Sequence, residues 1–275
     1  MYIMDGITGD TAPRIEMTEK QAKLTHDGRE VVEYSIETPR VSGAVNMSAE
    51  LAFNRYYTLQ AQSLITYNTG ALLRSAVMTM DGNERDGGLF SPFVFRLTCH
   101  DGYVGDRYVS VFFDRYESKG GAHGATTRSS DTWDFDRAGK AGLADLFTPG
   151  SDYMRPLMAG IRARAEEMGR GGTVDFYDGL DKNLTDYFDA QNFYLSKIGI
   201  VIYYQEYTIA PYAAGILEFT TPFAAFADML VYRELALQIP AMSAVALSPA
   251  AVPDSQPPRR IQRWNSVEEF ERTLG

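Results

Sequence analysis

A run of alternating side chains between positions 93 and 116 constrains the fold of this chain more than any other segment. From 93 to 99 every second residue is apolar, namely Phe93, Phe95, Leu97 and Cys99. A period of two is typical of a strand with one buried face, so Cys99 is expected in the core rather than as a reactive thiol. The Asp101-Gly102 pair then predicts a turn. Segment 107–116 is apolar on both faces, which predicts a central strand.

A strand pair and a long helix are predicted before this region. Residues 22–41 alternate in polarity around Asp27-Gly28, which is a hairpin turn signal. Ser48 is predicted to be the N-cap of a helix because a serine side chain accepts hydrogen bonds from the first free amides. Apolar residues at helical spacing extend this helix to about Met80, with Gly70 as a point of interruption.

The second half of the chain mixes helices and short strands. A helix is predicted near 151–170, because two glycines follow it directly. Strands are predicted at 192–195, 199–207 and 216–220, and a further helix at 223–235. This order predicts an α+β fold in which a mainly antiparallel sheet is packed by the long helix of the N-terminal half and by the helix near 151–170.

Changes in composition divide the chain into three parts. Residues 1–85 are predicted to form an N-terminal α+β subdomain, and residues 86–237 a C-terminal α+β subdomain. Residues 238–275 are rich in proline, alanine and serine, as linkers are. Within this tail, Ser266 and Glu269 have the spacing of a capping box, which predicts a short terminal helix.

Charge and cysteine content exclude several classes of protein. The 275 residues carry 36 acidic and 26 basic side chains, for a net charge of -10. This balance argues against a nucleic-acid partner and suits either solubility or a basic partner. One cysteine excludes a disulfide framework and a multi-cysteine zinc site, and three histidines leave little room for a histidine-rich metal site. No cofactor is expected. No apolar stretch reaches the ~18 residues of a membrane span, and the first residues do not resemble a signal peptide.

Gly120, Gly121, His123 and Gly124 form the most unusual local motif. Glycines permit a positive φ and close approach of the backbone. The motif is neither a P-loop nor a dinucleotide fingerprint, because neither spacing is present. Two interpretations stay open: a strand connection in which His123 binds the backbone, or a ligand-binding loop.

Several carboxylates define an enzymatic alternative. Asp131, Asp134 and Asp136 follow one another, and Asp134 and Asp136 are predicted to share a strand face. Paired carboxylates hydrolyse glycosides when they lie ~5 to 10 Å apart. Together with Glu206 they define a cell-wall glycan hydrolase as an alternative, although solvation of a turn and an edge strand explains them as well. The chain has no Gly-x-Ser-x-Gly elbow.

The segment from Tyr203 to Glu218 is dense in tyrosine, and Pro211-Tyr212 predicts a turn within it. Exposed tyrosines beside a rigid proline offer contact area at little entropic cost, so Pro211 and Tyr212 are candidate binding residues. Packing between strands is the competing interpretation, and it is favoured for Tyr203 and Tyr204.

Four segments of the chain resemble a known family. They are Tyr116–Gly124 (YESKGGAHG), Asp145-Leu146-Phe147, Asn192–Leu195 (NFYL) and Ile200–Phe219 (containing IYYQEYTIAPYAAGILEF). In order and spacing they resemble the extracellular domain of RsiV-type anti-sigma factors, a domain of unknown function that is shared with the N-terminal region of PdaC-type peptidoglycan deacetylases. The resemblance covers roughly residues 22–235.

The resemblance implies an α+β ectodomain without catalytic activity that binds a ligand at the cell envelope. In the anti-sigma factors this ligand is lysozyme, so lysozyme, another basic protein or a peptidoglycan-type glycan is the expected partner. The Gly120–Gly124 loop and the Pro211-Tyr212 turn are then the expected contacts. The sequence here lacks the sigma-binding segment, the membrane helix and the deacetylase domain. Because the first residues do not resemble a signal peptide, two alternatives stay open: a cytosolic protein with the same fold and a different ligand, or a trimmed ectodomain.

Overall fold

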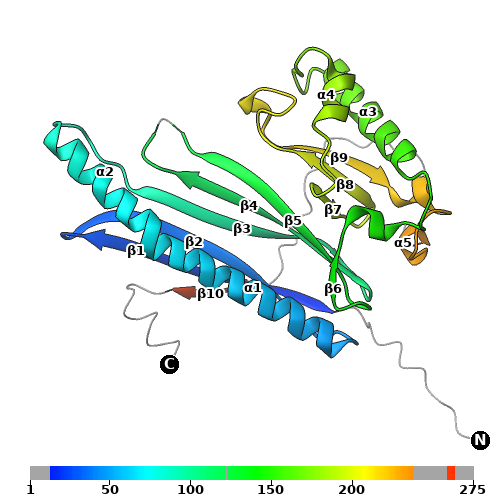
Figure 1. Cartoon of the computed structure of the whole chain (residues 1–275), viewed down its shortest axis with the longest axis horizontal. Coiled ribbons are helices and arrows are strands. Elements are labelled where there is room, and N and C mark those ends of the chain that lie inside the picture. Colours follow the sequence, from blue (N-terminus) through cyan, green and yellow to red (C-terminus); the bar gives the residue numbers. More distant parts are fainter. Residues whose placement is uncertain (1–12, 122, 238–258, 264–275) are drawn as a thin grey trace, which may run out of the picture.

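The computed structural model describes residues 13–121 and 123–237, together with the backbone of residues 259–263. Its large sheet has the strand order β10-β1-β2-β3-β4-β5-β6, and its small sheet has the order β7-β8-β9 (Figure 1). The strands of the large sheet are β1 (Arg14–His26), β2 (Arg29–Ser42), β3 (Phe93–Val104), β4 (Tyr108–Ser118), β5 (Ala125–Asp134), β6 (Gly139–Ala141) and β10 (Arg259–Arg263). The strands of the small sheet are β7 (Phe193–Leu195), β8 (Gly199–Tyr204) and β9 (Leu217–Pro222).

The helices lie on both sides of this pair of sheets. They are α1 (Met47–Tyr67), α2 (Leu73–Arg85), α3 (Met154–Arg170), α4 (Leu180–Asp186) and α5 (Glu234–Leu237). A π-helical segment, Asn68–Leu72, joins α1 to α2 and contains Gly70, where an interruption was predicted. The α+β class is confirmed, and so are the long helix and the mainly antiparallel pairing, since only β2–β3 and β1–β10 pair in parallel among the described strands.

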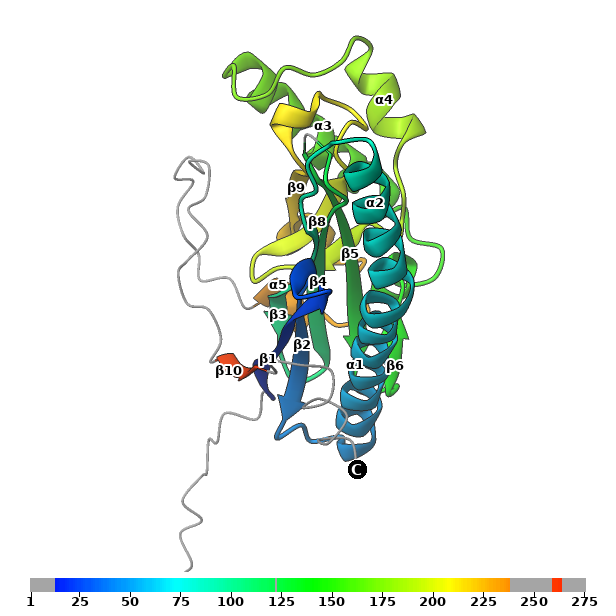
Figure 2. The same ribbon diagram turned by 90° about the vertical axis from the view of Figure 1, so that its left-hand side faces the viewer.

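Helices α1 and α2 cover one face of the large sheet (Figures 1 and 2). Phe53 and Tyr57 of α1 face this sheet, with ring centroids 5.4 Å from Trp133 and Phe113 respectively. One apolar core joins the N-terminal strand pair, the helix and strands β3 to β5. The division into residues 1–85, 86–237 and 238–275 remains a prediction; β2 pairs with β3 across position 85.

The small sheet packs against the opposite face of the large sheet. Phe112 points away from α1, and its ring stacks on Tyr194 of β7 with the centroids 4.4 Å apart. Alternate residues of β7 and β8 point the other way, into a second core that α3 closes. Strands β7 and β8 are therefore buried on both faces, whereas β9 alternates between buried and more exposed residues.

The turn predicted at Asp101-Gly102 is wrong. Strand β3 continues through both residues with a bulge, and ends only at Val104. The glycine is needed for another reason: a Cβ at position 102 would overlap the Leu195 carbonyl and lie 2.8 Å from the Tyr194 ring. Gly102 therefore allows β7 to approach the large sheet closely.

Two further boundaries also differ from the prediction. The N-cap of α1 is Asn46 rather than Ser48, and the Asn46 side chain accepts hydrogen bonds from the amides of Ser48 (3.1 Å) and Ala49 (3.2 Å). The helix predicted over 223–235 is absent, and a 3-10 turn and the short α5 replace it. Backbone groups of residues 229–231 instead bond to segment 146–148, so they are not available for helical hydrogen bonds.

The C-terminal tail contributes a strand to the large sheet. β10 pairs in parallel with β1 at its outer edge, with Met17 opposite Arg259 and Gln21 opposite Arg263. The predicted terminal helix and its capping box at Ser266 and Glu269 lie outside the described residues. Within the described part of the chain, no helix combines the length and apolar character that spanning a membrane requires.

Candidate functional site

The glycine-rich loop and the tyrosine-rich segment meet on the surface of the molecule. The His123 ring stacks on the Tyr212 ring, with centroids 4.9 Å apart and an interplanar angle of 25°. Tyr207 also stacks on Tyr212, with centroids 5.4 Å apart and an angle of 24°. Tyr207 is 55% exposed and Tyr212 37% exposed. We refer to His123, Tyr207 and Tyr212 as the aromatic stack.

Side chains of the segment after β8 hold this arrangement in place. Gln205 Oε1 accepts a hydrogen bond from the Arg128 amide (3.0 Å), and Gln205 Nε2 donates to the Arg128 carbonyl (2.7 Å). Glu206 Oε2 accepts a bond from the Thr126 amide (3.3 Å). Gln205 thus satisfies both backbone groups of one residue on the outer edge of β5, as a neighbouring strand would. This clamp fixes the 207–212 segment beside the loop that precedes β5.

The glycines of the loop have distinct structural roles. Gly120 has a φ of +80°, in the left-handed region that favours glycine. Gly124 is buried, and a Cβ there would overlap the Tyr116 ring. The His123 Nδ1 atom lies 3.0 Å from the Gly124 carbonyl, so His123 makes a backbone contact as well as the stack. Gly121 is exposed.

The structure thus brings together His123 and Tyr212, two of the predicted binding residues. Pro211 is exposed and precedes the short 3-10 turn Tyr212–Ala214, which orients the Tyr212 ring. Gly120, Gly121 and Gly124 shape the loop without ring contacts of their own. Their roles in binding remain predictions. Tyr203 and Tyr204 are each 2% exposed, as the packing interpretation predicts.

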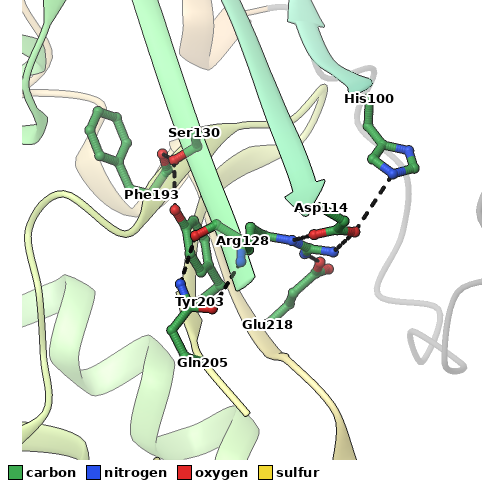
Figure 3. Close-up of polar contacts among 8 residues, drawn as sticks. All are labelled: His100, Asp114, Arg128, Ser130, Phe193, Tyr203, Gln205 and Glu218. Atoms are coloured by element: carbon green, nitrogen blue, oxygen red, sulfur yellow. Dashed lines mark hydrogen bonds and ion pairs between the residues drawn. The ribbon is translucent and has the colours of Figure 1, made fainter. Parts of the chain in front are cut away.

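A charged cluster beneath the site was not predicted from the sequence (Figure 3). The Arg128 side chain is only 10% exposed, and its guanidinium donates two hydrogen bonds of 2.7 Å to Asp114 on β4. It also pairs with Glu218 on β9, so one arginine connects the two sheets. Burial alone would lower the pKa of Arg128, but the hydrogen bonds and charges of Asp114 and Glu218 outweigh it and raise that pKa. The guanidinium therefore stays charged.

Aromatic rings surround this arginine. The guanidinium carbon lies 4.4 Å from the centroid of Phe112 and 5.8 Å from that of Tyr203, both distances suited to cation–π contacts. His100 stacks on Phe112, with centroids 4.6 Å apart, and its Nε2 lies 3.6 Å from Asp114 Oδ2. Burial raises the pKa of Tyr194, which keeps its hydroxyl protonated. These contacts make the cluster a joint between the sheets. No local motif marks Arg128, so the sequence offered no signal for it.

Asp131, a carboxylate of the hydrolase alternative, is engaged on the side of the sheet that faces α1. Its Oδ2 accepts a hydrogen bond from the Tyr57 hydroxyl (2.9 Å), and its Oδ1 lies 2.7 Å from Lys140 Nζ. The pKa of Tyr57 is raised well above its ordinary value, first by burial and then by the Asp131 charge. Asp131 therefore anchors a buried tyrosine in this structure.

The remaining carboxylates lie apart from Asp131. Asp134 is three residues further along β5 and so on the opposite face; it is 2% exposed and pairs with Arg107 at 2.9 Å. Asp134 and Asp136 do not share a strand face as predicted, because β5 ends at Asp134. Both carboxylates nevertheless pair with Arg107, and the Asp136 side chain is 67% exposed. Glu206 belongs to the clamp on β5. Among the described residues, no three His, Cys, Asp or Glu side chains are grouped as a metal site would require.

Two hollows on the described surface lie away from these carboxylates. One, of about 810 Å³, lies between β1, β2 and α1, and the other, of about 560 Å³, lies against α2. Asp131, Asp134 and Glu206 line neither hollow. The hydrolase alternative therefore gains no support from either of them.

Part of this chain matches a known protein family. Residues 144–224 match the family described as "Protein of unknown function (DUF3298)". The DUF3298 segment contains α3, the small sheet and the Pro211-Tyr212 turn, whereas the Gly120–Gly124 loop and the long helix precede it. No curated protein matches the chain.

Solved structures of DUF3298 proteins share the fold. A family member from Bacteroides fragilis superposes with a TM-score of 0.60 and 19% sequence identity, covering 84% of this chain and 98% of that one. A DUF3298 protein from Pseudomonas aeruginosa superposes with a TM-score of 0.52 and 16% identity, covering 82% and 96%. The similarity extends well beyond residues 144–224, so the large sheet and long helix belong to the shared architecture.

Proposed function

We propose that this protein is a binding domain without catalytic activity, and that the aromatic stack contacts a basic protein ligand. One observation carries the proposal. The sequence predicts contacts at the glycine-rich loop and at the Pro211-Tyr212 turn, and His123 of the loop stacks on Tyr212 of the turn at the surface. Tyrosine and histidine rings held in this way offer contact area with little further loss of conformational freedom.

The choice of a basic protein rests on charge. A net charge of -10 accelerates the encounter with a basic partner and disfavours acidic ones. A neutral glycan gains nothing from that charge. His123 and Tyr207 both stack on the Tyr212 ring, so aromatic neighbours already occupy part of the space over its faces. A sugar that stacks on a ring face is therefore less well suited to Tyr212 than a protein side chain.

The resemblance to RsiV-type anti-sigma factors supports lysozyme as the first ligand to test. In that family the resembling domain binds lysozyme, and the resembling segments include both parts of the aromatic stack. The matched family itself is described only as a protein of unknown function, so the ligand is our proposal.

The test is a calorimetric titration of the full chain with lysozyme, at low and at moderate salt. We expect saturable binding that persists at moderate salt and is lost in the double variant Pro211→Ala/Tyr212→Ala. Tyr56→Ala is the matched control. Tyr56 is 38% exposed, which is close to the 37% of Tyr212, but it lies on α1, away from the aromatic stack.

Three results would contradict the proposal in different ways. Binding that disappears at moderate salt would show only that an acidic protein meets a basic one. Equal losses in the double variant and in Tyr56→Ala would show that the effect does not come from the aromatic stack. Binding of an N-acetylglucosamine oligosaccharide that requires Tyr212, without binding of lysozyme, would replace the protein ligand by a glycan.

A further inference from the structure

Tyr207 has a backbone conformation that its residue type rarely adopts. Its φ is +63°, in the left-handed region. Among the described residues, only Asp27 and Ala138 share a positive φ without being glycine. Asp27 precedes Gly28 in a tight turn, where aspartate is well tolerated. A bulky aromatic residue with such a φ is an outlier, and outliers of this kind concentrate at functional sites.

The neighbours of Tyr207 hold its backbone in this conformation. On one side, two hydrogen bonds hold the Gln205 side chain to β5. The backbone carbonyl of Gln205 also accepts a hydrogen bond from the Thr208 amide (3.2 Å). On the other side, Ile209 and Ala210 are 1% and 3% exposed. The path of the chain is thus fixed on both sides of residue 207.

Folding alone does not explain a tyrosine at this position. Tyr207 is 55% exposed, so burial of its side chain stabilises the fold only slightly. Glycine would adopt the same φ without strain. The stacking contact with Tyr212 returns a stabilisation similar in size to the cost of a left-handed L-residue. Tyrosine therefore gives the fold little net advantage over glycine at this position, which favours a role of the ring outside the fold.

We infer that Tyr207 presents the free face of its ring to an arginine or lysine side chain of the basic protein ligand. This inference rests on the proposed function and adds a contact of defined chemistry to it. Among the described residues, Tyr212 provides the ring that stacks on Tyr207, and residue 207 as a whole is 55% exposed. Cations bind over the faces of aromatic rings, and a ring fixed in advance loses little freedom on binding.

The test compares Tyr207→Gly, Tyr207→Phe and Tyr207→Leu in the lysozyme titration and in thermal unfolding. Tyr207→Gly should unfold at nearly the same temperature as the native chain, because the backbone strain and the stacking contact with Tyr212 are lost together. It should bind roughly tenfold more weakly, and so should Tyr207→Leu, because the cation–π contact is lost. Tyr207→Phe keeps the ring face and should bind within about threefold of the native chain. Ala138→Gly is the matched control for strain, with unchanged binding.

Each alternative result separates this inference from the proposed function. If Tyr207→Gly binds normally while Tyr212→Ala does not, the inference fails and the proposed function stands. If Tyr207→Phe loses as much affinity as Tyr207→Leu, the hydroxyl rather than the ring face makes the contact, and the cation–π assignment is wrong. A clear fall in unfolding temperature for Tyr207→Gly would show that Tyr207 stabilises the fold, so that folding alone would explain a tyrosine at this position. If the native chain binds no lysozyme at either salt concentration, both proposals fail together.

Discussion

Replacing Arg128 with methionine should destabilise the protein by about 3 kcal/mol, because this arginine connects the two sheets. Removing one partner from a fully buried ion pair costs about 3–5 kcal/mol, since the remaining charge loses its counter-ion. The side chains of Asp114 and Glu218 are 24% and 40% exposed, so water solvates their charges in part after the arginine is removed. The loss of stability is therefore expected at the lower end of this range of about 3–5 kcal/mol. The lost cation–π contact with Phe112 is included in this value.

The assay is urea-induced unfolding followed by far-UV circular dichroism, with Arg128→Met, Asp114→Asn and the double variant. Because Arg128 and Asp114 share two hydrogen bonds of 2.7 Å, the cycle should give a coupling free energy of about 2 kcal/mol. Thermal unfolding should shift downward by about 6–12 °C for Arg128→Met, at roughly 2–4 °C per kcal/mol. Arg164→Met is the control, because Arg164 forms a surface i,i+3 pair with Glu167 and should cost about 0.5 kcal/mol or less.

A small effect would refute this reasoning. If Arg128→Met costs no more than Arg164→Met, the aromatic contacts between Phe112, Tyr194 and Tyr203 hold the sheets together without help from the ion pair. A coupling below about 0.5 kcal/mol would show that Asp114 is stabilised by water rather than by Arg128. A change in the m-value, the slope of the unfolding free energy against urea concentration, would indicate that the small sheet unfolds separately from the large one.

Three further perturbations follow from the structure. Gly102→Ala should cost about 1–3 kcal/mol in urea unfolding, because the added Cβ would meet the Leu195 carbonyl; a neutral result would mean that β7 can move outward. Asn46→Ala should cost about 1 kcal/mol, because two amides of the first turn of α1 lose their acceptor; an unchanged stability would show that water replaces the cap. Burial would raise the pKa of Glu117, but hydrogen bonds from Arg115, Lys119 and Tyr67 outweigh it and lower that pKa below its ordinary 4.5. The stabilisation from Glu117 is then full at neutral pH and lost as pH falls through the lowered pKa. Glu117→Gln should therefore reduce the unfolding temperature at about pH 7, and this reduction should shrink as pH falls through the lowered pKa; a constant difference would contradict this assignment.

Much of the fold follows from local patterns, and the errors have physical causes. The alternation from 93 to 99 predicts β3, and the double-sided apolar segment predicts the central position of β4. Asp101-Gly102 predicts a turn that the structure lacks, because a glycine that admits a neighbouring strand has the same local sequence signature as one that bends the chain. The N-cap error has a similar origin, since asparagine at 46 and serine at 48 are both good caps and only the backbone geometry distinguishes them.

The candidate site is less accessible to sequence reasoning. The glycine-rich loop and the Pro211-Tyr212 turn can be recognised from their composition. The contact between His123 and Tyr212 cannot, because it depends on how the two sheets pack. The Gln205 clamp on β5 replaces strand pairing by side-chain hydrogen bonds, which no periodicity reveals. Tyr207 could not be identified either, because tyrosine has no preference for the left-handed region.

The framework and the proposed contact surface are physically separate, and this separation makes the proposals testable. Gln205 binds the backbone of Arg128, whereas Asp114 and Glu218 bind its side chain. Changing the side chain of Arg128 should therefore weaken the contact between the two sheets. The backbone N–H and carbonyl of residue 128, which bind Gln205 and so position the aromatic stack, should be unaffected. Exposed rings at Tyr207 and Tyr212 contribute little to the core, so their replacement should change binding with little change in stability. A protein built in this way can alter its ligand by substitutions in the stack while the cluster around Arg128 preserves the fold.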